Sequence, residues 1–228
     1  DQIYTFSLRA RDIRAPHYKL RMATDNGVVE LPRSPNKTFF GFTPGGKDVR
    51  ITSDVDYFAC MIILGDDELY VEQAKGLVPG AASNKYVIYK GSDNLKKFNL
   101  GACGVHAGQT QQFDPENDQH NSSTDPNSLR VCKEVEIALA DDHLMFNEYG
   151  SIVAVENHNM TVLNNVETNY DFEFAVDLQF SLVEIFVATS SGNDPWTNST
   201  DPGALLDDFT NWGPSGFNNT HDNARLWS

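Results

Sequence analysis

The chain has 228 residues, of which 40% are hydrophobic and 11% aromatic, so it can bury a sizeable core. Its formal net charge of −15 argues against a nucleic-acid partner and against binding to an anionic membrane surface. No apolar run approaches the length of a membrane-spanning helix, so we expect no membrane span.

The first half of the chain has the alternating pattern of β-strands. Residues 3–8 and 18–22 alternate apolar and polar side chains, and Asn26-Gly27 predicts a tight hairpin turn after them. A continuous apolar run over residues 58–64 is typical of a buried strand. We therefore predict an antiparallel β-rich domain over residues 1–105.

Residues 106–130 differ in composition from both halves. They are rich in Gln, Asn, Asp, Ser and Pro, and Phe113 and Leu129 are their only large apolar residues. Such a segment cannot bury enough surface to offset its ordering entropy. We predict an exposed linker there, which forms the domain boundary.

The second half, residues 131–228, changes period. Residues 135–140 and 180–187 are strand-like, and the apolar residues between Ile152 and Tyr170 recur every three or four positions, as on one helix face. Strand, helix and strand in this order predict a parallel crossover and hence an α/β domain. The overall fold class is therefore predicted to be α+β.

The last residues of the sequence predict a second helix and an open end. Asp201-Pro202 is a typical helix start, and Gly213-Pro214 a typical stop. Leu226 and Trp227 have no later element in the sequence to pack against. We expect that the polypeptide continues beyond Ser228, or that a second chain supplies the remainder of this domain.

Three cysteines are present, so at least one thiol is unpaired or is paired outside this chain. Cys103 lies between Gly101 and Gly104, which keep the backbone slim enough to enter a narrow cleft, and a thiolate is a good zinc ligand. The alternative is a disulfide with Cys60 or Cys132. Cys60 lies in an apolar run, where a free buried cysteine is expected. The histidines His143 and His158 lie in helix-like stretches and are expected to pack or to face solvent rather than to bind metal.

Several segments, in their order and spacing, resemble one protease family. They are Phe58–Val71, Ala102-Cys103-Gly104-Val105, and the pair formed by residues 135–143 and 220–226. Together they resemble the zymogen of a reprolysin-type (adamalysin-like, ADAM-like) zinc metalloprotease, a branch of the metzincins. The matched parts are the late prodomain, the cysteine switch, and the first strand and the approach to the third strand of the catalytic domain.

The resemblance implies a function and a set of metal sites. In this family a prodomain thiolate fills the open position of the catalytic zinc, so Cys103 is implied as an inhibitory zinc ligand. Glu136 and Asp222 match positions that bind calcium in reprolysin-type domains, with a solvated acid as the alternative for Glu136. The implied protein is a latent, secreted zinc metalloendopeptidase that acts on protein or peptide substrates, and five Asn-x-Ser/Thr sequons lean towards secretion.

The sequence departs from the family at the catalytic signature, H-E-x-x-H-x-x-G-x-x-H. No such run occurs, and no two of the six histidines are four residues apart. We therefore expect no catalytic residue in this chain, an inactive chain by itself, and zinc ligands mostly beyond Ser228. Two other classes of function stay open: a non-catalytic secreted β-rich binding module, and a prodomain-type inhibitory or chaperone fragment.

Overall fold

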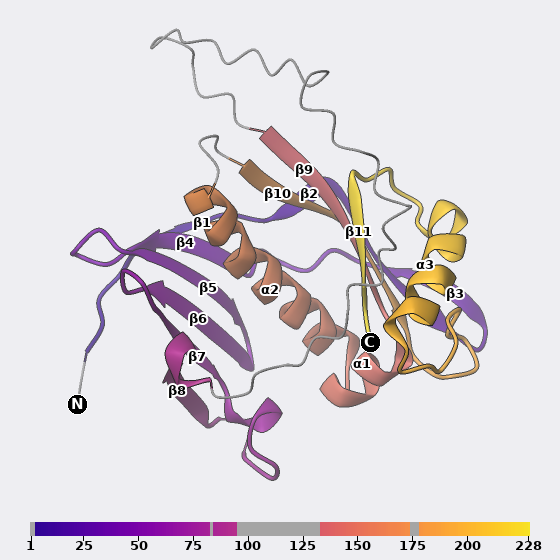
Figure 1. Cartoon of the computed structure of the whole chain (residues 1–228), viewed down its shortest axis with the longest axis horizontal. Coiled ribbons are helices and arrows are strands. Elements are labelled where there is room, and N and C mark those ends of the chain that lie inside the picture. The colour runs from indigo at the N-terminus through magenta and orange to yellow at the C-terminus, as the bar shows by residue number, and fades with distance from the viewer. Residues whose placement is uncertain (1–2, 83, 95–132, 174–177) are drawn as a thin grey trace, which may run out of the picture.

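A computed structural model of the chain describes residues 3–82, 84–94, 133–173 and 178–228 (Figure 1). In this part of the chain eleven strands form two sheets, and three α-helices accompany them. The molecule is a mixed structure with more strand than helix, in agreement with the predicted α+β class. The predicted linker, residues 106–130, lies outside the described residues, and so do Cys103 and Cys132 on either side of it.

Six strands of the first half form an antiparallel sheet. Its order is β1-β4-β5-β6-β7-β8, and each pair of neighbours is antiparallel. Alternating residues of β5 and β6, such as Val49, Ile51, Cys60 and Ile62, form its buried core. The strands are β1 (Ser7–Ala10), β4 (Thr38–Phe42), β5 (Asp48–Asp54), β6 (Tyr57–Ile63), β7 (Glu68–Gln73) and β8 (Tyr86–Lys90), with short 3₁₀-helices η1 (Ala74–Gly76) and η2 (Gly91–Asp93).

The second sheet combines strands from both halves of the chain. Its order is β11-β9-β10-β2-β3, in which β2 and β3 are an antiparallel hairpin and the other neighbours are parallel. The strands are β9 (Lys133–Asp141), β10 (Leu178–Ala188), β11 (Asn223–Trp227), β2 (Arg14–Thr24) and β3 (Gly27–Leu31). The helices are α1 (His143–Tyr149), α2 (Ile152–Glu173) and α3 (Pro202–Gly216).

Helices cover both faces of the five-stranded sheet. Val155, Met160 and Leu163 of α2 pack with Leu139 and Leu182 on one face. Phe209 and Trp212 of α3 pack with Ala140 and Phe186 on the other, and the near-continuous burial of β9 and β10 follows from this double cover. Helix α2 also contacts β5 of the first sheet, so it lies between the two sheets (Figure 1).

The five-stranded sheet joins the two halves of the chain. Strand β2 belongs to residues 1–105, but it pairs in parallel with β10 of the second half, from Leu182 opposite Arg14 to Ala188 opposite Ala23. An unpaired second edge of β10 would leave buried N–H and C=O groups without partners, and β2 satisfies them. Local periodicity predicts a strand over residues 18–22, but it carries no information about this distant partner.

The second half follows its predicted elements up to the end of α3. Helix α2 and strands β9 and β10 lie where the sequence placed them, and β9 and β10 are parallel. Asp201 caps α3, since its carboxylate accepts a hydrogen bond from the Gly203 N–H at 2.8 Å. The predicted stop at Gly213-Pro214 is wrong, because α3 continues to Gly216. The ring of Trp212 packs against Phe217 with their centroids 4.9 Å apart, which holds the last turn in place despite the proline.

The last two apolar residues of the sequence pack against earlier elements of the chain. Leu226 and Trp227 lie in β11, which pairs in parallel with β9, and each packs against one of the two cores of this sheet. None of the helices that the structure describes is long and apolar enough to cross a membrane.

Substituting Gly41 is expected to detach β1 from β4. A Cβ atom at Gly41 would lie 1.9 Å from the carbonyl oxygen of Ser7, a backbone atom that cannot move without breaking the pairing of the two strands. We expect Gly41→Ala to lower the free energy of unfolding by about 2 kcal/mol. Denaturant unfolding and hydrogen exchange of the β1 amides measure the effect.

Gly45→Ala is the matched control, since the nearest atom to its Cβ would be 3.8 Å away. Equal free energies of unfolding and equal hydrogen-exchange protection of the β1 amides in the two variants would show that β1 does not need glycine at position 41 to pair with β4.

Candidate functional site

Cys60 is a free, buried thiol on β6, as predicted. Burial raises its pKa to about 12, so it stays protonated and unreactive at neutral pH.

The two residues implied as calcium ligands lie side by side. The Glu136 N–H donates to the Asp222 carboxylate at 2.9 Å, and the Asp222 N–H donates to the Glu136 carbonyl oxygen at 2.9 Å. These reciprocal bonds join β9 to the start of β11. The Glu136 side chain is 35% exposed, and its carboxylate lies 3.8 Å from Nε2 of His17 on β2.

This pair offers part of a calcium site. Calcium takes six to eight oxygen ligands, and one Asp222 oxygen already accepts a backbone hydrogen bond. Within the described ranges, no group of three or more His, Cys, Asp or Glu side chains could hold a metal ion. Backbone carbonyl oxygens, Asn or Gln side chains, water molecules, or residues outside those ranges would have to complete the coordination.

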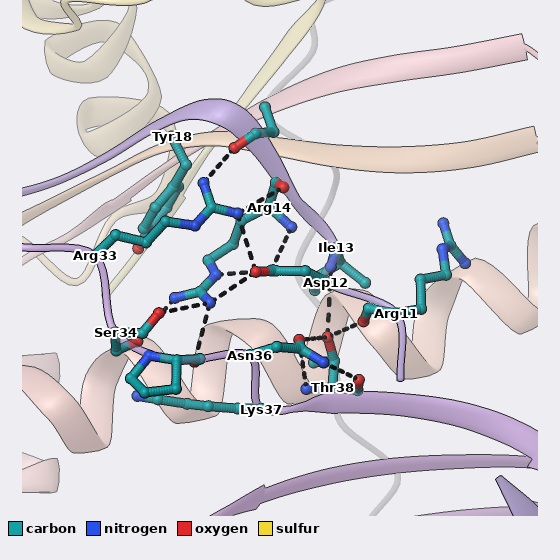
Figure 2. A network of polar contacts seen from close by, with 12 residues as sticks. Arg11, Asp12, Ile13, Arg14, Tyr18, Arg33, Ser34, Asn36, Lys37 and Thr38 are labelled. Atoms are coloured by element: carbon teal, nitrogen blue, oxygen red, sulfur yellow. Dashed lines mark hydrogen bonds and ion pairs between the residues drawn. The ribbon is translucent and has the colours of Figure 1, made fainter. Parts of the chain in front are cut away.

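A buried carboxylate on α2 is the centre of a second cluster, part of which Figure 2 shows. Glu156 is 1% exposed and pairs with Lys37 at 2.7 Å and with Arg14 at 3.3 Å. The Tyr18 hydroxyl also donates to it at 3.2 Å. Desolvation and the neighbouring Glu156 raise the pKa of this phenol well above its ordinary value, so it remains a donor.

The charges of this cluster balance. Arg14 also forms an ion pair with Asp12 at 2.8 Å, and Asp12 in turn binds Arg33 at 3.0 Å (Figure 2). Lys37 also pairs with Asp54 at 3.1 Å. Three cations therefore face three carboxylates, and Glu156 is the only one of the six that comes from the second half.

Two further buried glutamates of the second half are also paired with cations of the first half. Glu167 on α2 is 2% exposed and binds both terminal guanidinium nitrogens of Arg11. Glu184 on β10 is 0% exposed and accepts a hydrogen bond from Arg21 at 2.7 Å. Its second oxygen accepts the backbone N–H groups of Asn218 and Asn219, both at 2.9 Å. The first half thus neutralises every one of these three carboxylates.

A groove of about 1000 Å³ lies between the first sheet and helices α1 and α2. Tyr57 and Glu72 line it from the sheet side, and Tyr149 and His158 from the helix side. His158 Nδ1 lies 2.8 Å from the Tyr149 hydroxyl, and burial lowers the pKa of the imidazole to about 4. The ring is therefore neutral at pH 7 and serves as a packing group, as its position in the sequence suggested.

His143, also buried, pairs with Asp194 at 2.6 Å.

Sequence reasoning missed the three buried glutamates and their cations. One signal for Glu184 was present: it is the one charged residue in the apolar run of residues 180–187. A charge in such a run has to be buried with a partner. The partner itself could not be identified, since Arg21 and Glu184 are 163 positions apart.

No protein-family model matches this chain, and a search of curated proteins finds no match either.

Asp141 generates a test of pH dependence. It is 0% exposed at the end of β9, where Asn159 donates to one carboxylate oxygen at 2.7 Å. The other oxygen has no hydrogen-bond partner among the residues that the structure describes. Burial raises its pKa from 3.8 to about 8, so the folded protein retains a proton that the unfolded chain loses. The resulting stabilisation is complete below the unfolded pKa and is lost progressively as the pH rises to the folded pKa.

The measurement is denaturant unfolding of wild type and Asp141→Asn between about pH 4 and pH 9. We expect the wild type to lose stability relative to the variant by up to about 1.4 kcal/mol per pH unit, with no further change above about pH 8. Asp66→Asn, at an exposed acid, is the control. Parallel curves for wild type and Asp141→Asn would show that Asp141 is ionised in the folded protein.

Proposed function

We propose that the chain is the prodomain and the N-terminal part of the catalytic domain of a latent, secreted zinc metalloendopeptidase. The observation that carries the proposal is the pairing of Glu136 with Asp222. The family resemblance implied these residues as ligands of one calcium ion, although they are 86 positions apart, and they are joined by two hydrogen bonds. The parallel register of β11 on β9 brings the two residues together, as ligation of one shared ion would require.

The order of elements in the second half supports the same proposal. Parallel strands β9 and β10 flank α2, and α3 leads to a further parallel strand, β11. This is the start of an α/β layer of the kind expected for a metzincin-like catalytic domain. The six-stranded antiparallel sheet ahead of it fits a β-rich prodomain.

The described residues do not by themselves fit a zinc site. They hold no metal-ligating cluster, and the whole sequence lacks the H-E-x-x-H signature. In this proposal the zinc and its glutamate base belong to residues beyond Ser228, and Cys103 contributes the inhibitory thiolate. These 228 residues alone are therefore inactive towards the protein or peptide substrates of the complete enzyme.

A chaperone-type role for the first half is favoured by a separate observation. Each of the three buried glutamates of the second half has its cations in residues 11–37. A second half that folds without these cations would bury uncompensated charge. The first half would then assist folding as well as impose latency.

The inhibitory role of Cys103 is tested in a polypeptide that includes the zinc-binding residues. Cys103→Ala should raise peptide hydrolysis by the uncut protein at least about ten-fold, because an open zinc position admits water. Cys60→Ala is the control, since Cys60 is buried in the first sheet. A folded, zinc-loaded Cys103→Ala variant that stays as latent as the wild type would refute the thiolate switch.

The calcium site is tested by thermal unfolding of the same polypeptide. Calcium at about a hundred times its Kd should stabilise the wild type by about 2.7 kcal/mol. Asp222→Asn should abolish that gain, because it removes a charged oxygen ligand. Glu134→Gln, at an exposed acid on the same strand as Glu136, should keep it. An equal response to calcium in wild type and Asp222→Asn would exclude Asp222 as a ligand.

A further inference from the structure

The contacts between the two halves of the chain are those of a stable complex. We infer that residues 3–94 stay bound to residues 133–228 after the chain is cut between them, so that the first half is a lasting noncovalent subunit. This inference concerns the interface alone and goes beyond the proposed function. It does not depend on zinc or calcium.

The backbone pairing is the first argument. Strand β2 lies between β10 and β3, inside the five-stranded sheet, and continues along β10 from Leu182 to Ala188. The Leu182 N–H also donates to the carbonyl oxygen of Ile13 at 2.8 Å. Departure of the first half would strip β10, whose residues are buried on both faces, of the hydrogen bonds along one edge.

The shared apolar cores are the second argument. Ile13, Tyr18 and Leu20 are buried in the core that includes Leu139 and Leu182. Ala15 and Ala23, on the opposite face of β2, belong to the core beneath α3. Both faces of β2 are therefore committed to cores that the second half completes.

The buried charges are the third argument. Separation would leave Glu156, Glu167 and Glu184 without the cations that neutralise them in the folded protein. It would equally leave Arg14 and Lys37, which are themselves buried, without Glu156. Breaking one buried pair by removing a partner is strongly destabilising, and here three sets of pairs would break together.

Polar contacts extend the interface along α2. Asn164 donates to the carbonyl oxygen of Ile51 at 3.2 Å, and Asn157 donates to Asp54 at 3.2 Å. The hydroxyls of Tyr57 and Thr161 are 2.9 Å apart. These contacts join α2 to β5 and β6, so the six-stranded sheet is also anchored to the second half.

A cut between residues 95 and 132 breaks none of these contacts. In the proposed protease, such a cut would break the covalent connection between the two halves near Cys103. The first half would nevertheless stay bound to the folded enzyme. Removal of the prodomain would then need a further event, such as additional cleavage within residues 3–94. A failure of this inference would leave the thiolate switch intact, and a failure of the switch would leave this inference intact.

The experiment uses the full chain with a recognition sequence for a site-specific protease inserted between residues 106 and 130. After complete cutting, verified on a denaturing gel, size-exclusion chromatography and native mass spectrometry are run at micromolar concentration without denaturant. We expect the two pieces to migrate as one complex of 1:1 stoichiometry. Separation of the wild-type pieces under these conditions would overturn the inference.

Dissociation rates of variants test whether the buried pairs hold the complex. Glu184→Gln should release the pieces about ten- to a hundred-fold faster than the wild type, because it leaves the Arg21 guanidinium without a charged partner. Arg11→Gln is a milder variant, since the Arg11 side chain is 24% exposed, and it should also accelerate release. Glu134→Gln is the matched control and should leave the rate unchanged. Equal rates in all three variants would contradict the role of the buried pairs.

Discussion

Neutralisation of three buried glutamates is the constraint on which the arrangement of the chain depends. A carboxylate removed from water without a cation costs several kcal/mol, so Glu156, Glu167 and Glu184 fix where their partners must lie. The partners Arg11, Arg14, Arg21 and Lys37 all come from one stretch of the first half. That stretch must therefore lie directly against the second half. It does so as strand β2 and its flanking segments (Figure 2).

The same constraint explains the position of α2. An amphipathic helix normally turns its polar face to water, but both faces of α2 are buried. Its apolar face covers the five-stranded sheet, and its polar face meets β5 and β6 through Asn157, Thr161 and Asn164. The polar residues of this helix thus give the two sheets a defined relative position, which apolar contacts alone would specify less strictly.

Local signals predicted the elements and the parallel crossover from β9 to β10, whereas the pairing of β2 with β10 could not be predicted. The spacing of Ile152, Val155 and Val162 predicted α2, and the alternation in residues 18–22 predicted β2, because each pattern lies within one element. The position of β2 in the second sheet depends on contacts with β10, which is distant in the sequence. The periodicity of a single segment carries no information about such contacts. The pairing of Glu136 with Asp222 was implied only by resemblance to a family, and the Glu184–Arg21 pair had no signal that named its partner.

Strand β2 also connects the buried charges to the proposed calcium site at Glu136 and Asp222. His17, on β2, lies 3.8 Å from Glu136, and its carbonyl oxygen accepts a hydrogen bond from Asn219 at 3.1 Å. Four residues further along the same strand, Arg21 binds Glu184, which also accepts the backbone N–H of Asn219. A displacement of β2 would therefore disturb the proposed calcium site and the buried Glu184 together. Under the proposed function, the strand that completes the sheet of the proposed catalytic half belongs to the proposed prodomain, so folding and latency would depend on the same strand.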